Sequence, residues 1–122
     1  MTSKSYRDLL VWQKAMDLVE ETYRLTGGFP KQEEFGLKAQ MRRAAVSIPS
    51  NIAEGQGRHQ HKVFRQFLAV AMGSLSELET QLELSVRLRF LTEGGRERAS
   101  CLCKEIGKML YGLARSLPLA SH

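Results

Sequence analysis

Apolar residues recur at spacings of three and four along most of the chain, and no other feature constrains the fold as strongly. This spacing places side chains on one face of an α-helix, whereas a half-buried β-strand alternates every second residue. The pattern is clear over residues 10–26, and it returns over about 32–57, 59–91 and 99–117. No segment shows the alternation of a strand. The chain is therefore predicted to be all-α, with four amphipathic helices.

Pairs of glycines separate these segments, and glycine is common where a helix ends. The pairs are Gly27 with Gly28, Gly55 with Gly57, and Gly94 with Gly95. Because short turns favour antiparallel neighbours, we predict a single domain over residues 1–122, ordered over about 6–117, that folds as an antiparallel up-down-up-down four-helix bundle. Its core is predicted to contain Trp12, Met16, Leu37, Ile48, Phe67, Leu75, Leu82, Ile106 and Leu113.

The third segment predicts a helix about 50 Å long, at 1.5 Å per residue. The neighbouring helices are predicted to be shorter, so one end of this helix needs another surface to cover it. We therefore expect the protein to self-associate.

Pro49 lies inside the second predicted helix, within the stretch RRAAVSIPSNIAEGQGR that spans Arg42 to Arg58. A proline in a helix interior removes one backbone hydrogen bond. It also clashes with the carbonyl four residues earlier, here that of Ala45, at a cost of about 3 kcal/mol. We therefore predict a proline kink in this helix and a compensating interaction nearby.

Polar residues supply a candidate for that interaction. Two stripes share helical spacing: Arg43, Ser47, Asn51 and Glu54 in the second predicted helix, and Ser74 and Glu77 in the third. If the stripes meet, Arg43 faces a carboxylate across the helix pair. In that arrangement Asn51 or Ser47 bonds the backbone carbonyls that Pro49 leaves without a partner. The alternative is that these residues form a solvated face.

Basic residues are concentrated in one part of the chain. The sequence has 18 basic and 13 acidic residues, a net charge of +5. Between residues 38 and 65 six basic residues stand against Glu54 alone, an excess equal to the whole net charge. They are Lys38, Arg42, Arg43, Arg58, Lys62 and Arg65. Clustered Lys and Arg side chains neutralise phosphate groups. The predicted nucleic-acid-binding residues are Arg42, Arg58, Lys62 and Arg65.

Several classes of protein do not fit this sequence. No run approaches the roughly 18 to 20 apolar residues of a membrane span. The charged amino terminus lacks the apolar core of a secretory signal, so we expect a cytoplasmic protein. Cys101 and Cys103 are two residues apart in a predicted helix, where they cannot form a disulfide and lack the further ligands of a zinc site. We therefore predict packing thiols and no metal.

Catalytic motifs are also missing. A di-iron bundle needs Glu-x-x-His pairs, and neither Glu77 nor Glu79 has a histidine three residues later. The glycine-containing stretches GQGRH and GGRER lack the spacing and the ending of a phosphate-binding loop. We predict that the protein is not an enzyme and has no cofactor or small-molecule substrate.

The stretch RRAAVSIPSNIAEGQGR, followed by FRQFLAVAMGSLSELETQLEL, resembles the signature of a bacterial four-helix-bundle family, the 23S rRNA intervening-sequence proteins or S23 family. The stretches YRDLLVWQKAMDLV and LTGGFPKQEEFGLKAQMRRAA also fit its pattern, so the resemblance covers residues 6–117. Residues 56–60 are more basic than that pattern. The residues that match in type are Arg43, Ser47, Pro49, Asn51, Glu54, Gly55, Gly73, Ser74, Glu77 and Glu79.

The resemblance implies a cytosolic homo-oligomer, a ring of five bundles. Some members of the family are encoded within insertions in ribosomal RNA genes, and related proteins assist the reverse transcriptase of diversity-generating retroelements through a basic surface. Two functions remain open on this basis. One is a non-catalytic oligomer that binds RNA or DNA, and the other is a structural or protein-binding scaffold with no nucleic-acid role.

Overall fold

The computed structural model describes residues 5–119, and within them it contains helices and no strand. The four long helices are α1 (Leu10–Thr26), α2 (Leu37–Gly57), α3 (His61–Arg87) and α4 (Glu93–Ser116). Two short 3₁₀ helices, η1 (Tyr6–Asp8) and η2 (Lys31–Glu33), precede α1 and α2. The prediction of an all-α four-helix bundle is therefore confirmed.

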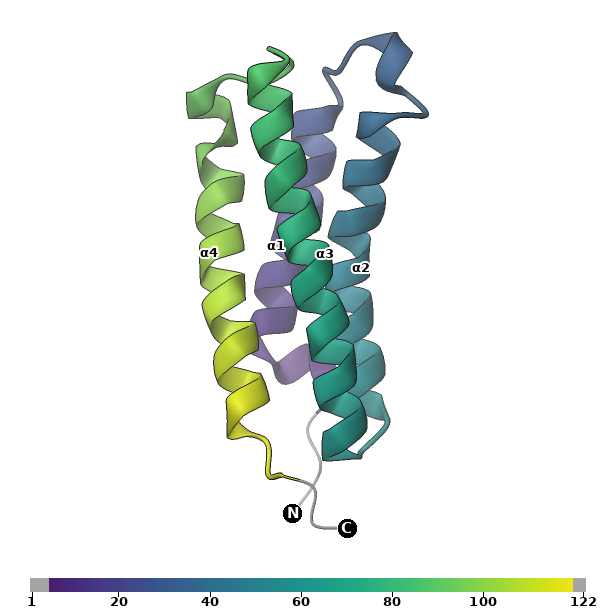
Figure 1. The fold of residues 1–122 in the computed structure, drawn as a ribbon, viewed down its shortest axis with the longest axis vertical. Helices are drawn as coiled ribbons and strands as arrows, with labels where there is room; N and C mark the ends of the chain where they lie inside the picture. Colours follow the sequence, from purple (N-terminus) through teal and green to yellow (C-terminus); the bar gives the residue numbers. More distant parts are fainter. Residues whose placement is uncertain (1–4, 120–122) are drawn as a thin grey trace.

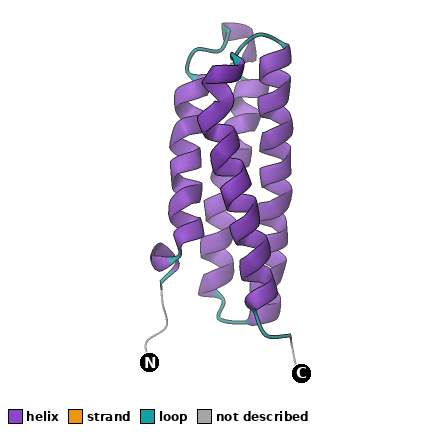
Figure 2. Cartoon of the chain, turned by 90° about the vertical axis from the view of Figure 1, so that its left-hand side faces the viewer, coloured by secondary structure: helices purple, strands orange, loops and turns teal. Residues whose placement is uncertain are grey.

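The helices lie side by side around one core (Figures 1 and 2). α1 contacts α2 and α4, and α3 contacts the same two helices, with the most extensive contact between α2 and α3. In Figure 1 the α1–α2 and α3–α4 connections lie at the upper end of the bundle, and the α2–α3 connection lies at the lower end. We call these the upper end and the lower end. Within the described chain, no helix is long and apolar enough to cross a membrane.

The bounds of three helices differ from those predicted. α4 begins at Glu93, before Ala99, so Gly94 and Gly95 lie in its first turn and do not separate it from α3. α2 begins at Leu37, later than expected, because η2 and a non-helical Gly36 interrupt the chain before it. α3 has 27 residues, where the pattern predicted residues 59–91. His59 and Arg89 flank it with φ angles of 58° and 67°, and this left-handed backbone cannot continue a helix. At about 40 Å, α3 is close in length to α4, so the length argument for self-association was wrong.

Most of the predicted core is correct. Ile48, Leu75, Leu82 and Ile106 are buried, and Trp12, Leu37 and Leu113 are half-buried and pack against them. Phe67 is half-buried. Met16 was assigned to the core wrongly, because 39% of its surface is exposed beside α2.

Pro49 is buried within α2, which continues through it as one helix. The predicted kink remains a prediction. Asn51 or Ser47 was expected to donate a hydrogen bond to the carbonyl that Pro49 leaves without a partner, and the bond observed is a different one. The Asn51 amide nitrogen donates to the carbonyl of Ser47 at 2.7 Å, and not to that of Ala45.

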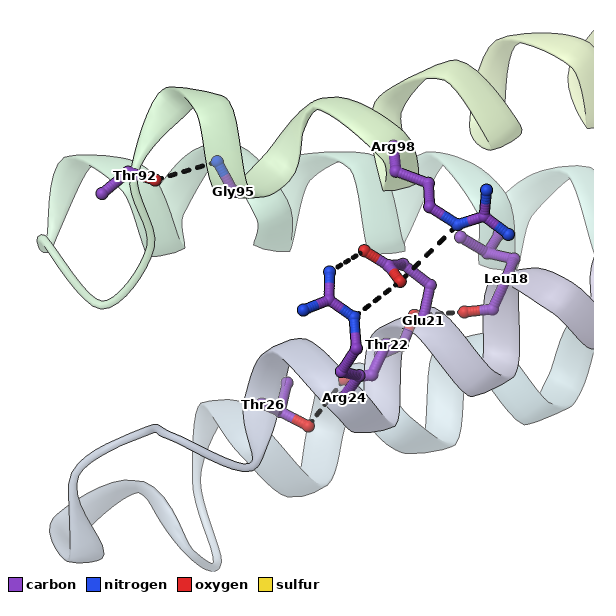
Figure 3. A network of polar contacts seen from close by, with 8 residues as sticks. All are labelled: Leu18, Glu21, Thr22, Arg24, Thr26, Thr92, Gly95 and Arg98. Carbon is purple, nitrogen blue, oxygen red and sulfur yellow. Dashed lines mark hydrogen bonds and ion pairs between the residues drawn. The ribbon is translucent and has the colours of Figure 1, made fainter.

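A polar network joins α1 to α4 near the upper end (Figure 3). The Glu21 side chain is buried, and its carboxylate pairs with Arg24 at 2.5 Å and with Arg98 of α4 at 3.7 Å. Beside it, the hydroxyls of Thr22 and Thr26 donate to the carbonyls one turn earlier in α1, at 2.7 and 2.8 Å. Each polar group buried in this part of α1 therefore has a partner, as burial requires.

Candidate nucleic-acid interface

The lower end of the bundle is where η1, the α2–α3 connection and the carboxyl end of α4 meet (Figure 1). Residues 5–9, 54–65 and 111–119 form this end, and they contain five basic and two acidic side chains, a net charge of +3. The basic residues are Arg7, Arg58, Lys62, Arg65 and Arg115, and we call them the basic end. His59 lies in the α2–α3 connection and His61 is the first residue of α3, and both are exposed.

Arg42 does not belong to this group. It lies near the amino end of α2, about 24 Å along the helix axis from Arg58 at 1.5 Å per residue. Its guanidinium donates to the Thr26 hydroxyl at 2.9 Å and to the Tyr23 carbonyl at 3.2 Å. It also lies 4.1 Å from the centre of the Tyr23 ring. Arg42 therefore fastens α2 to the end of α1, and the structure separates it from the other three predicted residues.

The two ends of the bundle differ in how their basic residues are neutralised. The described part of the chain has eight ion pairs. Six lie at the upper end and one at the lower end, between Arg58 and Glu54 at 2.7 Å. The eighth, between Lys14 and Glu105 at 3.5 Å, lies between the two ends. The upper pairs join Glu21 to Arg24 and Arg98, Lys38 to Glu34, Glu83 to Arg87 and Arg96, and Arg96 to Glu93. Hydrogen bonds from Arg96 and Arg87 lower the pKa of the Glu83 carboxyl, which keeps this network charged. Carboxylates therefore pair with basic side chains at the upper end, whereas the lower end keeps a net positive charge.

Three cations of the basic end, Lys62, Arg7 and Arg65, differ in their environment. Lys62 is exposed and, among the described residues, has no ion pair or hydrogen bond. The Arg7 guanidinium lies 5.6 Å from the Tyr6 ring and 5.8 Å from the Trp12 ring. Arg65 is half-buried, and it donates to the carbonyls of Leu117 and Pro118 just beyond α4, at 3.4 and 2.8 Å. Among these three, Lys62 and Arg7 are the more available to an anion.

Sequence reasoning missed Arg7 and Arg115. They are far from the α2–α3 connection in sequence, and only the packing of η1 and α4 brings them to the lower end. The predicted topology could have indicated them, because in an up-down bundle the start of the first helix and the end of the fourth lie beside the connection between the second and third helices. The basic residues between 38 and 65 also do not form one surface, because Lys38 and Arg42 lie at the upper end.

The polar stripes of α2 and α3 meet, as predicted, through one contact. The hydroxyls of Ser47 and Ser74 lie 2.8 Å apart, and Asn51 also donates to the Ser47 hydroxyl at 2.9 Å. These three side chains are half-buried. The contact fastens α2 to α3 beside Pro49.

The outer members of the stripes lie in solvent. Arg43, Glu54 and Glu77 are exposed, so for these residues the alternative of a solvated face is correct. Arg43 and Glu77 line one cavity of about 370 Å³, together with Ser47 and Ser74. In the described structure Arg43 and Glu77 form no ion pair with each other.

Gly55 has a role that its sequence position did not suggest. It is buried inside α2, and a Cβ atom there would lie 2.7 Å from the Phe67 Cβ and 2.9 Å from the Phe64 ring. A side chain at this position would therefore push α2 and α3 apart. By contrast, Gly57, the last residue of α2, has no atom within 4 Å of such a Cβ.

The two cysteines differ. Cys103 is buried, and burial, followed by the negative charge of Glu79, raises the pKa of its thiol to about 12. Cys101 is exposed, so it is not a packing thiol as predicted. Over the described residues, no group of three or more His, Cys, Asp or Glu side chains is placed to hold a metal ion.

Comparison with known proteins gives one family. The sequence pattern of the family described as 23S rRNA-intervening sequence protein matches residues 7–112. A solved structure from Bacteroides thetaiotaomicron, described as a protein with unknown function from the S23 ribosomal protein family, superposes with a TM-score of 0.81. It is 26% identical, and the match covers 88% of this chain and 100% of that one. No curated protein matches the chain.

Proposed function

The chain belongs to the 23S rRNA-intervening sequence protein family, and from this premise we propose that it is a non-catalytic, self-associating protein that binds the phosphate backbone of RNA or DNA through its basic end. The observation that carries the proposal is the uneven neutralisation of charge. Six ion pairs lie at the upper end of the described structure and one at the lower end, where the basic residues outnumber the acidic ones by three.

Exposed cations without carboxylate partners favour phosphate because binding releases the counterions that condense on a nucleic acid. Arg7 and Lys62 fit this description, and Arg58 shares its charge with one exposed carboxylate. Base recognition does not follow from these residues, because phosphate contacts carry no sequence information. Of the described phenylalanines near the basic end, Phe64 is buried, and the Arg58 guanidinium lies 5.5 Å from the centre of the half-buried Phe67 ring.

The test is a salt titration of binding to structured RNA, single-stranded RNA and duplex DNA. The basic-end variant carries Arg7→Gln, Arg58→Gln and Lys62→Gln. Each phosphate contact contributes about 0.7 to the slope of log affinity against log salt for single strands and about 0.9 for duplex DNA. If all three side chains contact phosphates, the variant loses about 2 units of slope on a single strand.

A matched control removes the same charge elsewhere. Lys31, Arg89 and Lys104 are exposed and lie outside the basic end, so their exchange for Gln changes the net charge equally. We expect this variant to retain most of the wild-type slope. Equal losses in the two variants would show that net charge alone drives binding. No binding by the wild type at low salt would leave the scaffold alternative.

A further inference from the structure

A hollow lies at the lower end of the bundle, where the α2–α3 connection meets Leu117, the residue that follows α4. Its volume is about 300 Å³, at the lower limit of the sites that bind small molecules. We call it the lower hollow. None of the five residues of the basic end lines it. The phosphate contacts proposed above therefore leave this hollow without a role.

The floor of the lower hollow is apolar and its rim is polar. Gly55 and Phe64 are buried and Leu117 is half-buried, so these three residues form the floor. The remaining lining residues are exposed or half-buried, and all of them carry side chains that form hydrogen bonds. They are Gln56, His59, Gln60 and His61. A ligand with a flat apolar surface and polar edges matches this lining.

Three side chains of the rim have a capacity for hydrogen bonds that the chain does not use. His59, Gln60 and His61 form no side-chain hydrogen bond within the described structure. Gln60 directly precedes α3, yet its amide does not cap that helix. A glutamine amide offers an acceptor as well as donors, whereas a bound phosphate group needs donors. The rim therefore indicates a ligand that carries donors of its own.

Two cations border the lower hollow. Arg58 directly precedes His59 and Lys62 directly follows His61, so each cation lies about 3.8 Å, between Cα atoms, from a histidine of the rim. A nucleotide within a strand combines the features that this arrangement requires. Its base is flat and has donors and acceptors along its edges, and a phosphate lies on either side of it.

We propose that the lower hollow receives one unpaired base of a single-stranded RNA or DNA, while Arg58 and Lys62 contact the phosphates beside it. An imidazole ring of the rim stacks on the base, and the Gln60 amide bonds to its edge, as in other proteins that bind single strands. The proposal rests on the function proposed above, and it adds that the nucleic acid bound there is single-stranded.

Pairing of the bases decides which nucleic acids can use the lower hollow. In a duplex each base is stacked and paired, so it reaches a pocket only when it is flipped out of the helix. An unpaired base enters without that cost. We expect little preference among the four bases, because an amide offers both a donor and an acceptor and every base has a flat face for stacking.

The test compares two single-stranded DNA probes of equal length, one of mixed sequence and one in which every nucleotide lacks its base. Both probes carry the same phosphates, so phosphate contacts alone predict equal binding. Fluorescence anisotropy measures both dissociation constants at low salt. We expect the wild type to bind the intact strand at least about fivefold more tightly, since stacking of one base contributes that factor or more. The salt dependence should be the same for both probes.

A variant of the lower hollow carries Gln60→Ala and His61→Ala. His59 is kept, because its φ of 58° is unfavourable for alanine. We expect this variant to bind both probes as the wild type binds the strand without bases. The control carries Gln32→Ala and Phe35→Ala, which remove an amide and a 94% exposed ring at the upper end. It should keep the wild-type preference, and circular dichroism checks that both variants remain helical.

The outcomes separate this proposal from the one on which it rests. A wild type that binds neither probe would overturn both. Equal binding of the two probes by the wild type would overturn the base site alone, and this comparison needs no variant. A preference that survives Gln60→Ala and His61→Ala would place the base elsewhere. An equal loss of affinity for both probes in that variant would show that the rim contacts the backbone, which also overturns the base site.

Discussion

Gly55→Ala tests the packing that joins α2 to α3. The added Cβ would lie 2.7 Å from the Phe67 Cβ, which is fixed to the backbone of α3 and cannot rotate away. It would also lie 2.9 Å from Phe64 Cδ1, which can move with its ring. Relief therefore requires the two helices to separate. Overpacking of this kind costs about 3 kcal/mol at its upper range.

The helix itself gains from the same change, because alanine favours a helix interior over glycine by about 1 kcal/mol. The net loss of unfolding free energy is therefore about 2 kcal/mol, or a fall in Tm of about 8 °C for a domain of this size. Urea denaturation followed by circular dichroism measures it. All variants need the same protein concentration, since self-association adds to apparent stability.

Gly73→Ala is the matched control. Gly73 lies in the interior of α3, and no atom lies within 4 Å of a Cβ placed there. We expect this substitution to raise the unfolding free energy by up to about 1 kcal/mol. If Gly55→Ala stabilised the protein as much as Gly73→Ala, the close approach of α2 and α3 at Gly55 would be refuted.

Two further predictions concern α2 and the thiols. Asn51→Ala should lower the unfolding free energy by about 1 kcal/mol, because it removes both hydrogen bonds to Ser47. Glu54→Ala should change the unfolding free energy by under about 0.5 kcal/mol, because the ion pair of Glu54 with Arg58 is exposed. Equal effects in urea denaturation would contradict the assigned burial. The Cys103 thiol, whose pKa is raised to about 12, stays protonated in the fold at a pH where the unfolded thiol ionises. Stability should therefore fall as the pH rises from about 9 toward 12, and Cys103→Ala should remove that part of the slope while Cys101→Ala should not. A disulfide reagent should label Cys101 in the folded protein and Cys103 only on unfolding, and rapid labelling of both would contradict its burial.

The helices could be predicted from the sequence because burial of one face imposes the 3.6-residue period directly. The bounds of α1 were predicted correctly, since Gly27 and Gly28 end its pattern. The bounds of α3 were not, because the left-handed residues that flank it are His59 and Arg89. Neither is a glycine, so composition gave no sign that the helix stops there.

Depth within the bundle was harder to predict than the helices themselves. Ser47, Asn51 and Glu54 share one stripe, yet the first two are half-buried and the third is exposed. Helical spacing gives the direction of a side chain from its axis. How far the next helix covers it depends on close contacts such as that of Gly55 with Phe67, which spacing does not contain. Met16 was misplaced for the same reason, because it lies at the edge of the apolar face of α1.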